Sequence, residues 1–352
     1  MRYKQVIESI PSLEQELMIK AQKRLDSLSK PLGSMGRLES MVKQIVGITK
    51  EMFPKVNKKE VVIMCADNGV VEEGISQSTK EITSIVTQNF MKGITGINVF
   101  SKHTGAEILV VDIGVDDDID CPGILDRKIR KGTWNIARGP AMTRQEAVRA
   151  IEVGIDIVES LKKKGVNLIG TGEMGIGNTT TSSAIAAFLT GCRVEDMVGR
   201  GAGLSRSAFN RKIEVVKRAI DVNKPDADDP IDVLAKLGGF DIAGLVGCYI
   251  GAGAYRIPIL IDGFISLTAA LVAIKLNPKL KDYILPSHGS AEPGTKKVMD
   301  FLGYEPYLNL GMRVGEGTGA ALAFHIVDAA IAAYTHMGTF GDAEIEPYVP
   351  LE

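Results

Sequence analysis

The chain is poor in cysteine, and its four cysteines lie far apart. They are Cys65, Cys121, Cys192 and Cys248 among 352 residues, and no CxxC pair occurs. Disulfide frameworks and structural zinc sites need closely spaced or numerous cysteines, so we expect neither. Reduced core thiols are typical of a cytoplasmic protein, and we expect that location.

An excess of charge of one sign is also missing. The 41 Lys and Arg residues nearly balance the 43 Asp and Glu residues, which leaves a formal net charge of −2. Nucleic-acid binding depends on a basic surface that neutralises phosphates, so nucleic acid is not an expected partner. Aromatic residues make up only 5% of the chain, which argues against a platform for stacking single-stranded bases.

The long apolar runs of membrane proteins are not evident either. The first twenty residues have no apolar core of the kind that a signal peptide needs. The most apolar stretch, 242–274, is interrupted by Arg256, Pro258 and Asp262. Its uninterrupted runs stay below the roughly 18 residues that a span requires. We therefore predict no membrane span.

Short apolar runs alternate with longer helical patterns from residue 61 onward. The runs are 61–66, 108–115, 166–170, 257–261 and, more weakly, 307–312. They are too short for helices and lack polar alternation, which is typical of strands buried on both faces. Helical periodicity separates them, for example at 144–164, 211–222 and 319–337. The order predicts an α/β fold with a doubly wound, mostly parallel sheet and helices on both faces.

Carboxylates lie in or directly after the predicted strands. They are Asp67, Asp112, Glu173, Asp262 and Glu316. Ligands of open α/β sheets bind at the carboxyl ends of the strands, so we expect the site at that edge.

Glycine is abundant, with 38 residues, and it is clustered. Segment 170–181 precedes an Ala-rich helix, and such a loop favours a phosphate, although a plain tight turn would also explain it. It is neither a Walker A loop nor a dinucleotide fingerprint. Glu316 stands between two glycines ahead of another helix, where it could be only a dipole-stabilised carboxylate. Lys212, after the 199–203 loop, could be a solvated lysine, and His288 could be structural.

The residues offer no metal cluster and no nucleophile motif. What remains is a set of anion cradles with isolated carboxylates. This inventory suits the transfer of a phosphorylated sugar by direct displacement, without metal or cofactor.

These segments resemble the nicotinate-nucleotide:dimethylbenzimidazole phosphoribosyltransferase family. The matching motifs lie between about Leu32 and Ala330 and read GTGEMGIGNTTTSSA, KLGGFDIAGLVG, PILIDGFIS, PSHGSAEPG and EPYLNLGMRVGEGTGAALA. The resemblance implies that phosphoribose moves from nicotinate mononucleotide to a benzimidazole nitrogen. The products would be free nicotinate and an α-riboside phosphate for assembly of the cobalamin nucleotide loop.

The resemblance also implies a domain organisation. An α/β domain is expected over 56–329, with the active site at the carboxyl ends of its strands. A small helical domain is expected from 1–55 together with about 330–352. Members of the family are usually homodimers, which we expect here, and a heterodimer with a paralogue is the alternative.

Individual residues carry the family's roles. The family's general base matches Glu316, and its second active-site carboxylate matches Glu173, which would stabilise positive charge on the ribose. The residues matched to nucleotide and phosphate binding are Gly175, Gly177, Asn178, Thr179, Thr180, Gly203, Lys212 and Ser290. The residues matched to the base pocket are Ser78, Val86, Met174, Gly289 and Val314.

Two positions depart from the family pattern in the base pocket. Val86 stands where the best-known members carry Gln, and Gly289 stands where some carry Phe. The resemblance thus implies a roomier, more apolar pocket and leaves the base open. The alternatives are another benzimidazole, adenine or a phenol, activated by one chain or by a heteromer. A non-catalytic nucleotide sensor is a third reading, which the presence of both Glu173 and Glu316 disfavours.

Overall fold

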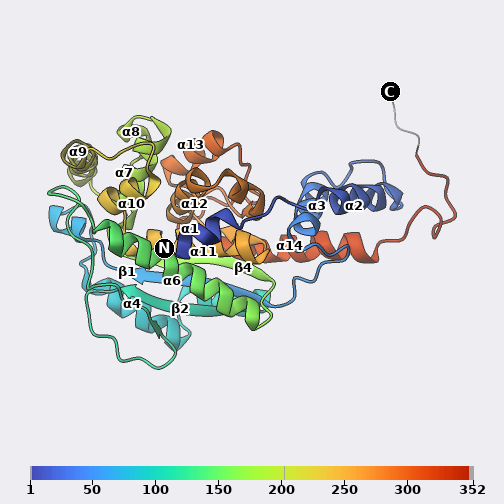
Figure 1. The fold of residues 1–352 in the computed structure, drawn as a ribbon, viewed down its shortest axis with the longest axis horizontal. Coiled ribbons are helices and arrows are strands. Elements are labelled where there is room, and N and C mark those ends of the chain that lie inside the picture. The colour runs from blue at the N-terminus through green and yellow to red at the C-terminus, as the bar shows by residue number, and fades with distance from the viewer. Residues whose placement is uncertain (1, 202, 349–352) are drawn as a thin grey trace.

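The computed structural model describes residues 2–201 and 203–348. Its centre is a six-stranded sheet of order β3-β2-β1-β4-β5-β6, in which all neighbouring strands are parallel. The strands are β1 (Lys59–Ala66), β2 (Ala106–Gly114), β3 (Leu125–Asp126), β4 (Leu168–Met174), β5 (Ile259–Ile261) and β6 (Ile284–Pro286). The sheet grows from β1 first to one side and then to the other, so the topological switch point lies between β1 and β4. The predicted doubly wound α/β fold is confirmed (Figure 1).

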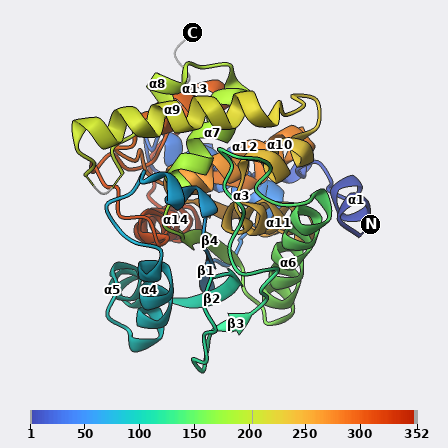
Figure 2. The same cartoon turned by 90° about the vertical axis from the view of Figure 1, so that its left-hand side faces the viewer.

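The two faces of the sheet bury alternate residues of the same strand. In β1, all of which is buried, Val61 and Ile63 contact one apolar core, while Val62 and Met64 contact a second. The first core includes side chains of α4 (Glu81–Lys92), α5 (Gly96–Thr104) and α14 (Thr318–His336), and the second includes those of α6 (Arg144–Lys163), α11 (Phe240–Tyr255) and α12 (Phe264–Leu276). Figure 2 shows α4 and α5 on one side of β1 and β2, with α6 and α11 on the other. Burial on both faces explains why these strands lack polar alternation.

Further helices extend the two layers. They are α1 (Arg2–Glu8), α2 (Gln15–Ser27), α3 (Arg37–Thr49), α7 (Asn178–Thr190), α8 (Val194–Met197), α9 (Arg206–Asn223), α10 (Pro230–Leu237) and α13 (Pro293–Leu302), with 3-10 turns η1 (Gly69–Glu73) and η2 (Pro278–Tyr283). The helices α7, α8, α9 and α13 pack on one another. Because α7 begins four residues after β4 ends, this group stands at the carboxyl edge of the sheet.

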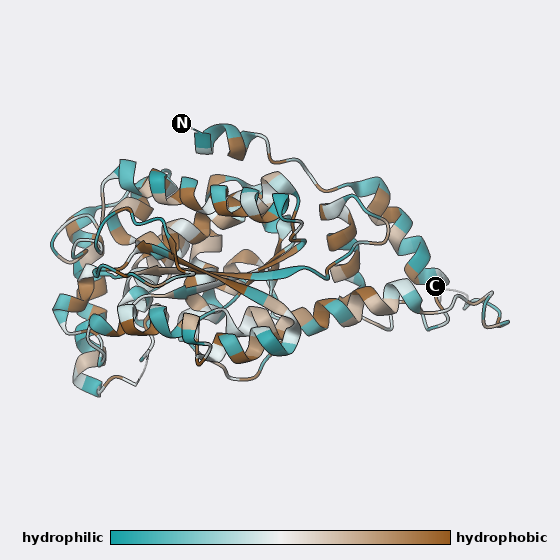
Figure 3. Cartoon of the chain, turned by 90° about the horizontal axis from the view of Figure 1, so that it is seen from below, coloured by the Kyte–Doolittle hydropathy of each residue, from teal (hydrophilic) through white to brown (hydrophobic). Residues whose placement is uncertain are grey.

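Helices from both ends of the sequence meet beyond the sheet. In Figures 1 and 3, α14 extends past the sheet toward α2 and α3. Leu25 of α2, Ile45 of α3 and Tyr334 of α14 are buried in the same apolar core as one face of the sheet. In contrast, α1 packs on α6 and α11. The division into 1–55 with about 330–352 and 56–329 stays a prediction, and residues 349–352 lie outside the described part.

One predicted strand is wrong. Segment 307–312 forms no strand, and only Leu308 makes an isolated bridge, to His288. The edge of the sheet is instead formed by β6, whose three residues were too short a run to be predicted. Segment 307–312 runs beside residues 286–291 and exchanges single backbone hydrogen bonds with them, but these amount to one isolated bridge and not to a continuous ladder. The short strand β3 was also not predicted.

One described helix, α14, has the length and apolar composition that a membrane span needs. More than half of that window, 56%, is buried inside the protein. Burial of this kind is what a core helix packed on a sheet also shows. The apolar helices α11 and α12 are shorter.

Candidate active site

A cavity of about 330 Å³ opens at the carboxyl edge of the sheet, next to the switch point. Its walls come mainly from segments 173–179, 263–265, 288–292 and 313–316. The first two of these segments follow or end β4 and β5, and the last precedes α14. The cavity thus lies where the sheet topology predicts a ligand.

Most of the sequence-predicted residues line this cavity. They are Glu173, Glu316, Gly175, Gly177, Asn178, Thr179, Ser290, Ser78, Val86, Met174 and Val314. Gly203 and Lys212 line a smaller hollow next to it, which shares Gly177 and Thr179 with the cavity. Two predicted site residues that the structure describes, Thr180 and Gly289, line neither the cavity nor the hollow.

Thr180 points into the protein interior, and Gly289 faces a neighbouring loop. Thr180 is fully buried in the first turn of α7. A Cβ on Gly289 would lie 2.5 Å from the side-chain oxygen of Asn309, so that position faces segment 306–309. The expected contributions of Thr180 to nucleotide binding and of Gly289 to the base pocket are therefore not supported by the geometry.

Two loop glycines are required by the fold itself. A Cβ on Gly175 would lie 2.4 Å from the carbonyl oxygen of Ala66, and one on Gly177 would lie 2.8 Å from a methyl group of Val71. Gly177 also has φ +95° and forms the N-cap of α7. A larger side chain at either position would disturb the fold before it blocked a ligand. The tight-turn and ligand-loop readings of this segment are thus compatible.

Glu173 lies at the end of β4 in an acidic, buried setting. Its carboxylate accepts a hydrogen bond from the side-chain amide of Asn178, and the same amide donates to Asp241 at 3.1 Å. Burial raises the pKa of Glu173 to about 8, and the negative charge of Asp241 adds to the effect. Burial and the neighbouring negative charge therefore favour the protonated form of Glu173 at neutral pH.

Glu316 lies on a loop with unusual backbone geometry. It has φ +61°, between Gly315 at +81° and Gly317 at +92°. Its carboxylate accepts a hydrogen bond of 3.0 Å from the backbone N–H of Ile97, at the start of α5. Burial raises the pKa of Glu316, and the N–H groups of Gly96 and Ile97 oppose that rise.

The two carboxylates converge from different elements. A Cβ on Gly315 would lie 2.8 Å from Oε1 of Glu173, so the loop that carries Glu316 covers Glu173. Burial and neighbouring carboxylates favour the protonated form of Glu173, whereas backbone N–H groups favour the ionised form of Glu316. Such a pair is suited to stabilising a cation and accepting a proton at one place.

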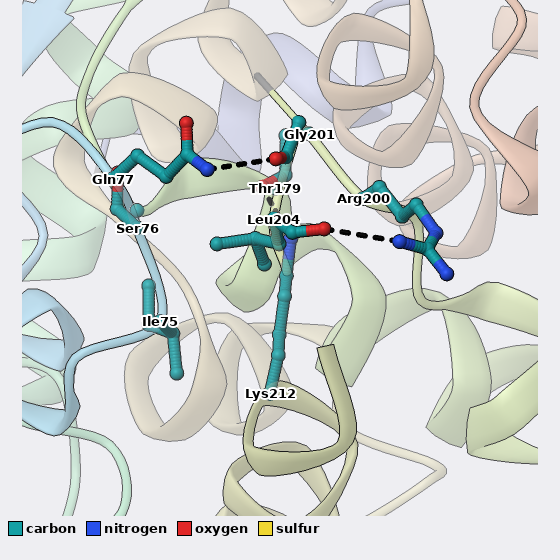
Figure 4. A pocket seen from close by; sticks show the side chains of 10 residues that line it. Ile75, Ser76, Gln77, Thr179, Arg200, Gly201, Leu204 and Lys212 are labelled. Atoms are coloured by element: carbon teal, nitrogen blue, oxygen red, sulfur yellow. Dashed lines mark hydrogen bonds between the residues drawn. The ribbon is translucent and has the colours of Figure 1, made fainter. Parts of the chain in front are cut away.

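Lys212 is buried and belongs to the hollow beside the cavity. It is only 1% exposed, and its ammonium group donates to Oγ1 of Thr179 at 2.7 Å (Figure 4). The same group donates to the carbonyl oxygen of Gly199 at 3.4 Å. Burial lowers its pKa to about 8, although Glu292 opposes that effect. Lys212 lies in the second turn of α9. Because its side chain is buried, the solvated-lysine interpretation is wrong.

The hollow has the donors that an anion needs. Figure 4 shows Lys212, Thr179 and Arg200 around it, with Gln77 bonded to the carbonyl oxygen of Gly203 at 2.8 Å. A buried cation beside glycine-rich backbone and the N-terminus of α7 can hold a phosphate group.

Three polar residues that line the cavity were not among the predicted site residues. Arg313 donates to the carbonyl oxygen of Gly201 at 2.6 Å, Glu292 is buried and precedes α13, and His288 is 2% exposed. All three stand in motifs that were singled out, but only the folded chain shows that they reach the cavity. Within residues 2–201 and 203–348, no three His, Cys, Asp or Glu side chains are placed to hold a metal ion.

The parallel α/β sheet carries two carboxylates and an anion-binding hollow at its switch point. This combination is typical of enzymes that act on nucleotides. Residues 10–345 match a family model described as phosphoribosyltransferase. The chain is 69% identical to a nicotinate-nucleotide–dimethylbenzimidazole phosphoribosyltransferase of Acetivibrio thermocellus, over 98% of this chain and 99% of the relative. It is 66% identical to the protein of that name from Ruminiclostridium cellulolyticum over both whole chains.

A solved structure agrees. The crystal structure of the same-named phosphoribosyltransferase from Thermus thermophilus matches with a TM-score of 0.90 at 36% identity, covering 95% of this chain and 99% of that one. The chain therefore belongs to the nicotinate-nucleotide–dimethylbenzimidazole phosphoribosyltransferase family, as the sequence motifs predicted.

Proposed function

We propose that this enzyme transfers phosphoribose from nicotinate mononucleotide to dimethylbenzimidazole, within cobalamin assembly. The bond between C1′ and the pyridinium nitrogen breaks, and nicotinate leaves with the bonding electron pair as a neutral ring. A benzimidazole nitrogen supplies the new bond to C1′ and becomes positively charged. Its other N–H then loses a proton, so the reaction needs one base and no external acid.

The residues of the cavity are assigned roles within this reaction. Glu316 accepts the benzimidazole proton, and the N–H of Ile97 stabilises its ionised form. Glu173 faces the positive charge of the substrate. Since that charge favours ionisation, substrate binding would release a proton from Glu173. Lys212 and its hollow receive the 5′-phosphate.

The observation that carries the proposal is the convergence of Glu173 and Glu316 on one cavity, next to a buried lysine. Incubation with nicotinate mononucleotide and dimethylbenzimidazole, followed by mass analysis, tests it. We expect equal amounts of nicotinate and of α-riboside phosphate. A chain that binds the nucleotide but makes no riboside with any base would be a sensor instead.

A second base specificity is favoured by one feature. Val86 lines the cavity and offers no hydrogen bond to a base, so bases without a matching polar edge should be accepted as well. The same incubation with benzimidazole, adenine and a phenol measures the preference.

We further propose a homodimer in the cytoplasm. Light scattering of the purified chain tests the dimer, and two distinct subunits in the native complex would favour the heteromer.

A further inference from the structure

Asp262 is a buried carboxylate that holds the start of α14. It directly follows β5 and is 1% exposed. One of its oxygens accepts from the N–H groups of Gly319 at 2.7 Å and Ala320 at 3.3 Å, and the other accepts from Gly317 at 3.2 Å. The N-cap residue of α14 is Gly317, which has no side chain, so the cap comes from a different element.

The loop held by Asp262 is the one that carries Glu316. A non-glycine residue at φ +61° is in a disfavoured conformation, and it persists only where the surrounding structure enforces it. The enforcement comes from both sides. A Cβ on Gly172 would lie 2.5 Å from the carbonyl oxygen of Glu316, so this peptide rests on β4. Asp262 holds the same peptide group from its other end, because it accepts from the N–H of Gly317.

The charge of Asp262 acts in the same place. Its carboxylate lies 3.7 Å from Nε2 of His288, and its negative charge raises the pKa of Glu173, Glu316 and Tyr249. A negative neighbour makes a carboxylate a stronger base. Loss of Asp262 would therefore both loosen the loop and weaken Glu316 as a proton acceptor.

We propose that Asp262 is a positioning residue for Glu316: it fixes the loop 315–317 and keeps the carboxylate between the N–H of Ile97 and the cavity. The inference rests on the proposed function, in which Glu316 is the base. Asp262 itself is not among the described residues that line the cavity, so it acts through the loop.

The variant Asp262→Asn tests this inference. Asn has one acceptor oxygen in place of two, so its NH₂ group must face either the Gly317 N–H or the Gly319 N–H, and donors repel each other there. We expect kcat to fall at least tenfold, with the KM for nicotinate mononucleotide within threefold. The effect should vanish in the Glu316→Gln background, since a residue that acts through Glu316 has nothing left to position.

A matched control is available on another helix. Asp229 caps α10 by accepting from the N–H groups of Ile231 and Asp232, and it does not line the cavity. Asp229→Asn should lower the melting temperature and leave kcat within twofold. If Asp262→Asn does not fold, Asp262→Ser keeps a capping oxygen without the charge and is expected to behave as Asp262→Asn.

Activity and structure together separate the outcomes. In a crystal structure of the variant, the distance from the Glu316 carboxylate to the N–H of Ile97 should exceed 3.5 Å. An unchanged loop, a kcat within twofold of the parent, or an equal loss in the Glu316→Gln background would each overturn the inference. A parent chain that forms no riboside phosphate would overturn the proposed function instead, and the loop geometry would still decide the role of Asp262.

Discussion

Glu173→Gln should make this protein more stable, increasingly so as the pH rises. The pKa of Glu173 lies at about 8 against an ordinary 4.5, because the carboxyl group is buried and faces Asp241. Each tenfold change in proton affinity is worth about 1.4 kcal/mol, so ionising Glu173 in the empty site costs on the order of 5 kcal/mol. The folded state binds the proton more tightly than the unfolded chain does. Stability is therefore lost as the pH rises from about 4.5 through about 8.

Gln cannot ionise and escapes this loss. At pH 5 the variant and the parent should melt within about 2 °C of each other, since Glu173 is protonated there. At pH 9 the full penalty applies, and at about 2 °C per kcal/mol the variant should melt on the order of 10 °C higher. Calorimetry or circular dichroism of the ligand-free chain across pH 5–9 measures the difference.

A carboxylate with the opposite behaviour provides the control. Glu146 is partly buried, but Thr143 and Arg130 hold its pKa below the usual value. Glu146→Gln should therefore destabilise the protein at neutral pH, and the loss should shrink as the pH falls through the lowered pKa. If the advantage of Glu173→Gln is the same at pH 5 and pH 9, Glu173 does not hold a proton in the folded state and the reasoning is wrong.

Three further predictions concern the reaction. Glu316→Gln should lower kcat by roughly 10²–10⁴ with a small change in nucleotide KM, and a kcat within threefold of the parent would leave Glu316 with only a structural role. Val86→Gln should shift kcat/KM toward bases with a hydrogen-bonding edge, by roughly 1–3 kcal/mol if the amide is buried and paired, whereas an unchanged ranking of bases would show that position 86 does not face the base. Turnover should be unaffected by a chelator, and a loss that a divalent ion restores would contradict a metal-free mechanism.

The site could be located from the sequence because some of its residues stand out in their local context. Glu173 and Glu316 stand in glycine-rich segments next to a strand end or a helix start, where polar side chains are not needed for packing. Val86 and Ser78 were reached only through the family resemblance, and the structure brings both to the cavity. Gly289 was reached in the same way and is directed toward Asn309 instead, because a motif position does not specify which way the backbone faces.

The sequence by itself determined the layered fold. Apolar runs such as 61–66 have no polar alternation because both faces of a parallel strand are covered. This pattern can be read from the sequence without knowing which elements cover the strand. Tertiary structure decided what depends on contacts distant in sequence. The three residues of β6 form a strand only because β5 lies beside them, and Lys212 is buried only because α9 packs on α7. The proton affinity of Glu173 is raised by burial and by Asp241, 68 positions further along the chain. Both effects depend on distance in space, which only folding creates.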